Sequence, residues 1–259
     1  MHHFFVSSEN IDETAGLAVI DDSVDYNHAV NVLRLKAGEQ ILISDSDGCD
    51  YLCAVRQAAP DKRLELDIIE KAGENHELPA RVILFQCVPK SDKMELIIQK
   101  AVELGVTDIV PVFSKYCVVK LDDKKAESRI KRWQAISESA AKQSKRSVIP
   151  KIHKPVDFKQ AAEMCEQCDV RIIPYEAEDG LTGICEAIVN FLPGRSIGVI
   201  VGPEGGFAPM EVTMAKRHAI VPVSLGKRIL RAETAAIAIL SLIMIRLEIA
   251  AGIDLSTEE

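Results

Sequence analysis

Beyond residue 80, the sequence alternates between short apolar runs and longer segments with helical periodicity. The apolar runs are typical of buried strands: RVILFQ (81–86), IVPVF (109–113), VRIIP (170–174), SIGVIVG (196–202) and VPVSLG (221–226). The helical segments lie near residues 93–104, 124–145, 180–191, 209–219 and 232–250. Because strands that alternate with helices are joined by crossover connections, the pattern predicts an α/β fold whose parallel sheet is covered on both faces.

The first part of the chain has a different pattern. Short strands are expected at residues 4–6, 40–44, 51–55 and 63–69, with one short helix at 26–35. The segment GENHELPA (73–80) combines Gly, Pro and polar residues without periodicity. We therefore expect a small β-rich domain over residues 1–72 and an α/β domain over residues 73–259.

Composition excludes several classes of protein. With 259 residues, 47% of them hydrophobic, the chain can bury real cores. The start MHHFFVSSEN lacks the pattern of a secretory signal, and no run reaches the roughly 18 charge-free apolar residues of a membrane span. We expect a soluble, cytoplasmic protein without a membrane segment.

The cysteines do not form a recognisable framework. There are seven of them at irregular spacing, which favours reduced thiols over disulfides. Cys165 and Cys168 form a single CxxC, but no second ligand pair completes a zinc site. We expect two structural thiols at a helix end and no metal.

Charge is unevenly distributed. The net charge is −8, yet residues 115–154 hold twelve Lys or Arg against four Asp or Glu. Such a block can attract a polyanion to one face, because phosphate contacts dominate nucleic-acid affinity. A solvated helix face explains the same charges, and charge alone does not decide between the two.

Ligands of open parallel sheets bind beyond the carboxyl ends of the strands, in the loops that lead to helices. Three loops are therefore of interest: 174–176, 202–207 and 225–231. The second, GPEGGF, is neither the GxGxxG nor the GxxxxGK[ST] motif, which removes the main support for nicotinamide or ATP binding. The third, LGKRILR, is basic and precedes a helix rich in Ala, which permits close packing.

Six blocks in order now resemble a known family. They are MHHFFV (1–6), HAVNVLRLKAGE (28–39), KSDKMELIIQKAVELGV (90–106), RW with ESAAKQSKR (132–146), IVGPEGGF (200–207) and SLGKRILRAETA (224–235). Nearly the whole chain resembles the SPOUT superfamily of knotted RNA methyltransferases. Within it, the chain is similar to the bacterial enzymes that methylate uridine at ring nitrogen 3 in 16S ribosomal RNA.

The resemblance implies a fold, a cofactor and partners. The fold would be a C-terminal α/β trefoil-knot methyltransferase domain with an N-terminal PUA-like β-barrel domain, in a homodimer. The substrate would be 16S rRNA within the small ribosomal subunit, and S-adenosyl-L-methionine would bind in the knot. The implied cofactor-binding residues are Glu176, Gly202, Pro203, Glu204, Gly205, Gly206, Leu225, Gly226, Ile229, Leu230 and Arg231.

Methyl transfer to the uridine imide requires that its proton leaves and that negative charge on the ring is stabilised. Arg231, beside the cofactor loop, is the first candidate for this catalytic role, and Arg146 from the basic helix is the second. Either could instead contact phosphate. The expected RNA-binding residues are Arg34, Lys142, Lys145 and Arg146.

Other residues are assigned structural roles or depart from the family pattern. His3 replaces an Arg found in many relatives, and Asn31 replaces a basic residue. His3 and His28 are not assigned to the chemistry. Gln99, Glu103 and Trp133 are interpreted as parts of packing helices, with the tryptophan buried.

Two alternatives remain open at this point. A ribose 2′-O-methyltransferase of the same superfamily would share the Gly-rich loop and the last helix. A non-catalytic RNA-binding or ribosome-assembly factor could have kept the same fold.

Overall fold

The computed structural model describes residues 1–45, 47–71, 76–118 and 123–252, with the side chains of 123–125 excluded. These form two compact units. The first comprises Met1–Glu77 and Ala141–Ile149, and the second comprises Leu78–Ala140 and Pro150–Glu259. The domain boundary predicted after residue 72 falls within 72–75, outside the described residues.

The first unit is built on a six-stranded sheet in the order β1-β4-β5-β6-β3-β2, in which only the β1–β4 pair is parallel. The strands are β1 (His3–Phe5), β2 (Ile11–Asp12), β3 (Leu17–Ile20), β4 (Gln40–Ser44), β5 (Asp50–Ala58) and β6 (Leu64–Lys71). All four predicted strands are confirmed. The sequence did not reveal β2 and β3, which are short and lack a clear alternation of their own.

The predicted helix near residues 26–35 is present in two parts. α1 (Ser23–Asn27) continues directly into a π-helical turn over His28–Val32. Asp22 caps α1, because its Oδ1 accepts the backbone N–H groups of Val24 and Asp25 at 2.9 Å. The cap explains why the helix begins earlier than its apolar spacing indicates.

The segment Ala141–Ile149 belongs to the first unit, although its first three residues end a helix (Asp123–Gln143) whose other residues belong to the second. Arg146 forms an ion pair with Glu77, and its Nε donates to both carboxylate oxygens at 3.1 Å. Lys142 Nζ lies 2.9 Å from Asp25 Oδ1, and Ser147 Oγ donates to Asp50 Oδ2 at 2.7 Å. Charged partners therefore hold this segment to the β-rich unit.

The second unit contains a parallel sheet in the order β10-β8-β7-β12-β11-β13, with β9 also paired to β8. Its strands are β7 (Arg81–Cys87), β8 (Asp108–Phe113), β9 (Lys151–Ile152), β10 (Val156–Asp157), β11 (Val170–Pro174), β12 (Ser196–Val201) and β13 (Val221–Val223). The five predicted strands are confirmed. β12 lies between β7 and β11, both of which precede it in the chain.

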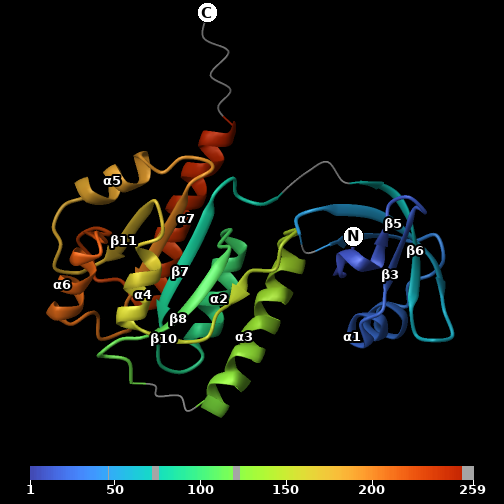
Figure 1. The fold of residues 1–259 in the computed structure, drawn as a ribbon, viewed down its shortest axis with the longest axis horizontal. Helices are drawn as coiled ribbons and strands as arrows, with labels where there is room; N and C mark the ends of the chain where they lie inside the picture. Colours follow the sequence, from blue (N-terminus) through green and yellow to red (C-terminus); the bar gives the residue numbers. More distant parts are fainter. Residues whose placement is uncertain (46, 72–75, 119–122, 253–259) are drawn as a thin grey trace, which may run out of the picture. The chain divides into compact units, whose positions relative to one another are not determined.

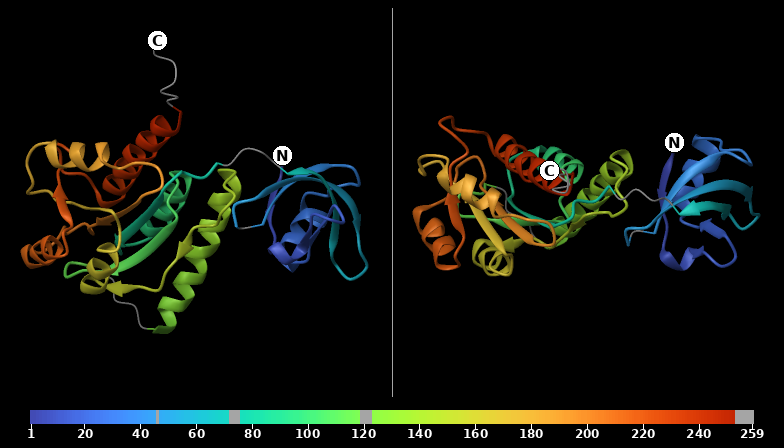
Figure 2. Two further views of the ribbon diagram at one scale, coloured as in Figure 1. Left: turned by 45° about the horizontal axis from the view of Figure 1, so that its top comes forward. Right: turned by 90° about the horizontal axis from the view of Figure 1, so that it is seen from above.

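Helices cover both faces of this sheet (Figures 1 and 2). They are α2 (Lys93–Glu103), α3 (Asp123–Gln143), α4 (Phe158–Cys165), α5 (Thr182–Val189), α6 (Pro209–Arg217) and α7 (Ala232–Gly252). α2 and α7 lie side by side on one face, and α4 and α6 lie on the other. The predicted helices are confirmed, and α4 is the helix that the sequence pattern missed.

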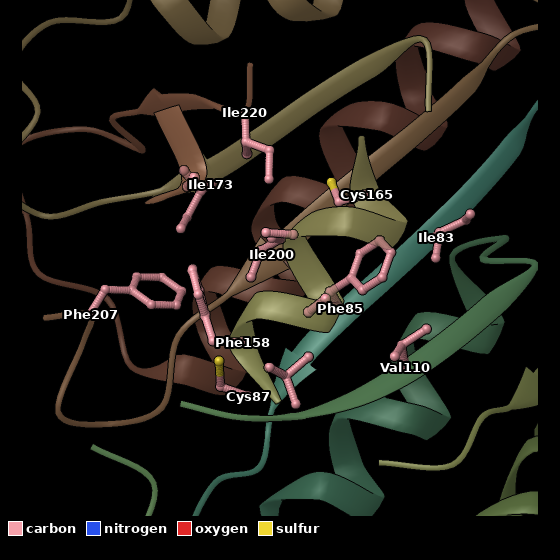
Figure 3. Close-up of a cluster of buried hydrophobic side chains, with 14 of the residues drawn as sticks. Ile83, Phe85, Cys87, Val110, Phe158, Cys165, Ile173, Ile200, Phe207 and Ile220 are labelled. Atoms are coloured by element: carbon pink, nitrogen blue, oxygen red, sulfur yellow. The ribbon is translucent and has the colours of Figure 1, made fainter. Parts of the chain in front are cut away.

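β7 contributes buried side chains to both faces of the sheet. Its residues Val82 to Cys87 are all buried, and alternate side chains point in opposite directions. Ile83, Phe85 and Cys87 join the cluster beneath α4 and α6 that Figure 3 shows. The sequence of a strand that is buried on both faces is a continuous apolar run. This is why the parallel sheet could be predicted.

The CxxC cysteines lie in the same cluster. Cys165 ends α4, and both it and Cys168 are buried free thiols. A Cβ on Gly198 of β12 would lie 2.6 Å from Cys165 Sγ, so the glycine makes room for the thiols. The prediction of structural thiols at a helix end is confirmed, as is the buried position of Trp133.

α7 is the one helix in the described part of the chain that is long and apolar enough to cross a membrane by length and composition. One side of it is buried in the second unit, at Ala236, Ile239, Leu240 and Ile243, where it contacts α2 and β12. Buried core helices meet the same criterion of length and composition.

Candidate functional site

A cavity of about 260 Å³ lies at the carboxyl ends of β11, β12 and β13. Three loops line it, and they are the three selected from the sequence. Ten of the eleven predicted cofactor residues are brought together there: Glu176, Gly202, Pro203, Glu204, Gly206, Leu225, Gly226, Ile229, Leu230 and Arg231. Other lining residues of the same segments were not predicted to contact the cofactor, including Tyr175, Ser224, Arg228 and Ala235.

Gly205 differs from the expectation. It is absent from the described residues that line the cavity, and a Cβ added to it would lie 2.9 Å from Tyr116 Cβ. The role of this glycine is therefore close packing of the loop against the segment that follows β8. The sequence alone cannot show that the adjacent residues Gly205 and Gly206 have different surroundings.

The neighbouring glycines shape the cavity itself. Gly206 and Gly226 have φ values of +67° and +108°, a region that other residues rarely adopt. A Cβ on Gly206 would lie 3.5 Å from Glu176 Oε1, and one on Gly202 would lie 3.0 Å from the Phe207 ring. Larger residues at these positions would strain the loop or fill the space that a ligand requires.

The end of this loop is held by Glu211 of α6. This buried carboxylate accepts the backbone N–H of Ala208 at 2.9 Å and that of Lys115 at 2.8 Å. Pro209 occupies the first turn of the helix, where its missing N–H costs nothing. The Gly-rich loop thus ends in a fixed helix start that is tied to the segment after β8.

Glu204 is held by a different segment, the start of α2 and the turn before it. Its carboxylate accepts the backbone N–H of Lys90 at 3.2 Å and forms an ion pair with Lys93 at 3.1 Å. Partial burial alone would raise the pKa of Glu204, but its own backbone N–H and these two partners hold the pKa below the ordinary value. The side chain therefore lines the cavity as a carboxylate at neutral pH.

The basic residues at the cavity belong to the second unit, unlike the other basic residues that were predicted to have a function. Arg231 is exposed, lines the cavity and directly precedes α7. Arg228 also lines it and is exposed. Both guanidinium groups belong to the loop after β13, so a ligand in the cavity would have cationic neighbours.

The four predicted RNA-binding residues all lie in the first unit. Arg34 and Lys145 are exposed, whereas Lys142 is half-buried against Asp25. The side chain of Arg146, for which both an RNA contact and a catalytic role were predicted, is 3% exposed and pairs with Glu77. Its position indicates that it anchors the segment Ala141–Ile149. Lys120 and Asp122 of the basic block lie outside the described residues.

His3 also lies in the first unit. Its Nε2 is 2.6 Å from Ser44 Oγ, and Ser44 in turn donates to Asp50. Burial lowers the pKa of His3 more than the nearby Asp50 raises it. His3 therefore belongs to a structural polar network that also includes Ser147. Within the described chain, no group of three or more His, Cys, Asp or Glu side chains could hold a metal ion.

Together, the fold and the cavity define an α/β domain that binds a small ligand where its parallel strands end, accompanied by a β-rich domain. Two family models match the chain. The RNA methyltransferase domain matches residues 76–244, and the RNA methyltransferase PUA domain matches residues 20–69.

Individual relatives agree with these matches. The ribosomal RNA small subunit methyltransferase E of Bacillus subtilis is 36% identical over 257 residues, which cover 97% of this chain and 99% of the relative. The solved structure of the same-named protein from Neisseria gonorrhoeae, bound to S-adenosylmethionine, has a TM-score of 0.81 at 30% identity and covers 95% of this chain and 97% of its own. A putative methyltransferase from Legionella pneumophila, in complex with the same cofactor, has a TM-score of 0.80 at 28% identity, with coverage of 94% and 96%.

The chain belongs to this family of RNA methyltransferases. The predicted α/β fold with a PUA-like N-terminal domain is confirmed, and so is the prediction of a methyltransferase. S-adenosylmethionine, the predicted cofactor, is the ligand of the two solved relatives.

Proposed function

We propose that this chain transfers the methyl group of S-adenosylmethionine to ring nitrogen 3 of a uridine in the 16S ribosomal RNA of the small ribosomal subunit. The observation that carries the proposal is the convergence of three loops on one cavity, with ten of the eleven cofactor residues that the family resemblance implied. Membership in the RNA methyltransferase family supports the reaction class.

The cavity fits the cofactor chemically. S-adenosylmethionine carries a sulfonium cation and an amino group, and two acidic residues, Glu176 and Glu204, are among those that line the cavity. The positive φ of Gly206 and Gly226 allows the backbone to approach a ligand closely. Ile229 is 85% exposed and Leu225 lines the cavity, so apolar contacts are available for an adenine ring.

When bound, the cofactor supplies an activated methyl group, so the chain must mainly align the acceptor and exclude water. The uracil ring becomes negatively charged as its imide proton leaves. Arg231 is the group that we propose to stabilise this charge, because it is exposed and lines the cavity. Arg146 is not proposed for this role, since its guanidinium is buried against Glu77.

The first unit is proposed to hold the RNA. Arg34 and Lys145 are exposed there, and a family model of PUA domains from RNA methyltransferases matches residues 20–69. Half-buried Lys142 is proposed as a weaker contact, because Asp25 already neutralises part of its charge. Exposed lysine and arginine are the side chains that phosphate groups attract.

The remaining features are proposed from the same family assignment. A homodimer is supported by α7, whose apolar side chains Leu242, Ile245 and Ile249 are 41%, 49% and 49% exposed. A trefoil knot is supported by the insertion of β12 between two strands that precede it. We also propose a cytoplasmic location, where ribosomal subunits are assembled.

The test combines binding with mapping of the modified base. Calorimetric titration of the purified protein with S-adenosylmethionine should give one saturable site per chain. Mass mapping of ribosomal RNA from cells that lack the gene should show loss of one methyl group from a base of a 16S uridine. Loss of a ribose methyl group would instead identify a 2′-O-methyltransferase. No binding and an unchanged methyl map would indicate a non-catalytic RNA-binding protein.

A further inference from the structure

Lys93, the first residue of α2, connects two parts of the cavity wall. Its Nζ lies 3.1 Å from Oε1 of Glu204, in the loop after β12, and 3.2 Å from Oε2 of Glu233, in the first turn of α7. Glu204 lines the cavity, and Glu233 lies between the lining residues Ala232 and Ala235. Lys93 is not itself among the described residues that line the cavity.

We infer that Lys93 is a positioning residue for cofactor binding. It fixes the loop after β12 relative to the start of α7, and thereby sets the shape of the cavity between them. The inference rests on the proposed binding of S-adenosylmethionine at this cavity.

The location of Lys93 is unfavourable for the helix that contains it. A cation at a helix N-terminus opposes the helix dipole, and Asp92, which precedes α2, makes no capping hydrogen bond from its side chain. Lys100, later in the same helix, has an ordinary partner in Glu103 at 2.8 Å. Lys93 therefore gains its stabilisation from the two carboxylates of the cavity wall.

Glu204 extends the connection to a third segment. Its carboxylate accepts the backbone N–H of Lys90, and the next residue, Ser91, has a φ of +57°, a strained conformation for a residue with a side chain. The turn before α2 is thus held against the loop after β12. Two carboxylates, those of Glu204 and Glu233, and the ammonium group of Lys93 join the starts of α2 and α7 to the Gly-rich loop.

Removal of the ammonium group would leave two carboxylates facing each other. Both lie within ion-pair distance of one nitrogen atom, and their side chains are only 27% and 15% exposed. Like charges at this separation repel, and partial burial weakens the screening by water. The two parts of the cavity wall would move apart, and the affinity for the cofactor would fall.

The experiment compares the affinity of four full-length proteins for S-adenosylmethionine by calorimetry. Lys93→Met should raise the Kd by about tenfold relative to the wild type. The double variant Lys93→Met with Glu233→Gln should recover most of this loss, because it removes the repulsion while leaving Glu204 on the Lys90 N–H. Lys100→Met, on the same helix but paired with Glu103, is the matched control and should bind like the wild type.

The pH dependence separates repulsion from general damage to the fold. In Lys93→Met, one of the two facing carboxylates should have a raised pKa. Lowering the pH from about 8 to about 5 should protonate it and bring the Kd closer to that of the wild type. Glu176, Arg228 and Arg231, which line the same cavity as Glu204, are present in all four proteins, so the ratio of Kd values compares only the changed residues.

Each outcome has a definite meaning. If the wild type does not bind S-adenosylmethionine, the proposed function fails and this inference fails with it. If the wild type binds and Lys93→Met binds equally well, the inference alone is overturned. A weakened Lys93→Met that neither the second substitution nor lower pH restores would indicate a damaged fold, and would also overturn the positioning role.

Discussion

Two arginines that look equivalent in the sequence have opposite surroundings in the structure. Arg231 is exposed at the cavity of the second unit, whereas Arg146 is buried in the first unit against Glu77. Each follows a basic stretch beside a motif shared with the family. The comparison shows that positive charge near a motif does not identify a functional cation. Burial and the presence of a carboxylate partner separate a group that can meet a ligand from one that holds the chain together.

The largest expected effect is on catalysis at Arg231. Arg231→Ala should lower kcat for methyl transfer by about 100-fold to 1000-fold, because the charge that develops on the uracil ring would lose its cationic neighbour. Single-turnover transfer of a labelled methyl group to 30S subunits from the gene-deleted strain would measure it. Lys227→Ala, four residues earlier in the same loop, is the matched control. Equal rates for Arg231→Ala and the wild type would remove this arginine from the chemistry.

Arg146 should show the reverse pattern, a loss of stability. Arg146→Met would leave the carboxylate of Glu77 half-buried without its main partner, which should lower the free energy of unfolding by about 3 kcal/mol. Urea denaturation, compared with the exposed neighbour variant Lys145→Met, would measure the effect. If Arg146→Met were as stable as the wild type but inactive, the two arginines would share a functional role after all.

The comparison also shows how far the sequence could predict the structure. Strands such as β4 and β11 were predicted to the residue, because continuous or alternating apolar runs reflect burial directly. The three cavity loops were predicted, since ligands of parallel sheets bind where strands end. These features depend on local pattern and on one general rule of topology.

Other features could not be predicted from local pattern. The partner of Arg146 is 69 residues away in the sequence, so its burial could not be read from the basic block around it. Gly205 was assigned to the cavity with its neighbours, but the segment that contacts it follows another strand, β8. α4, by contrast, was missed although Asp157 and Gln160 form a capping box at its start, which is a local signal in the sequence. For Arg146 and Gly205, contacts distant in sequence determine the surroundings.

A smaller effect is expected for Lys145, which is exposed in the first unit close to buried Arg146. Lys145→Glu should weaken RNA binding several-fold and reduce the slope of log affinity against log salt by about 1, because one phosphate contact is lost. Affinity for S-adenosylmethionine should remain unchanged. Fluorescence titration with a 16S rRNA fragment at several salt concentrations would test this, and an unaltered slope would exclude Lys145 from the RNA interface.

The smallest expected effect concerns Glu204, the acidic counterpart of these basic groups at the cavity. Its pKa is lowered in the folded protein, so its ion pair with Lys93 adds stability above the ordinary carboxylate pKa. This contribution should be lost as the pH falls through the lowered pKa. Because the groups are partly exposed, its size should be at most about 1 kcal/mol.

Thermal unfolding of the wild type and of Glu204→Gln, from about pH 7 to about pH 3, would reveal this contribution as a difference in Tm that shrinks with acidity. The glutamine can still accept the Lys90 N–H, so the comparison isolates the charge. A difference that persists at the acid end would mean that the carboxylate stabilises the loop through hydrogen bonds alone. Glu204 would then resemble Glu211, whose partners at 2.8 and 2.9 Å are backbone N–H groups, rather than one end of an ionic bridge across the cavity wall.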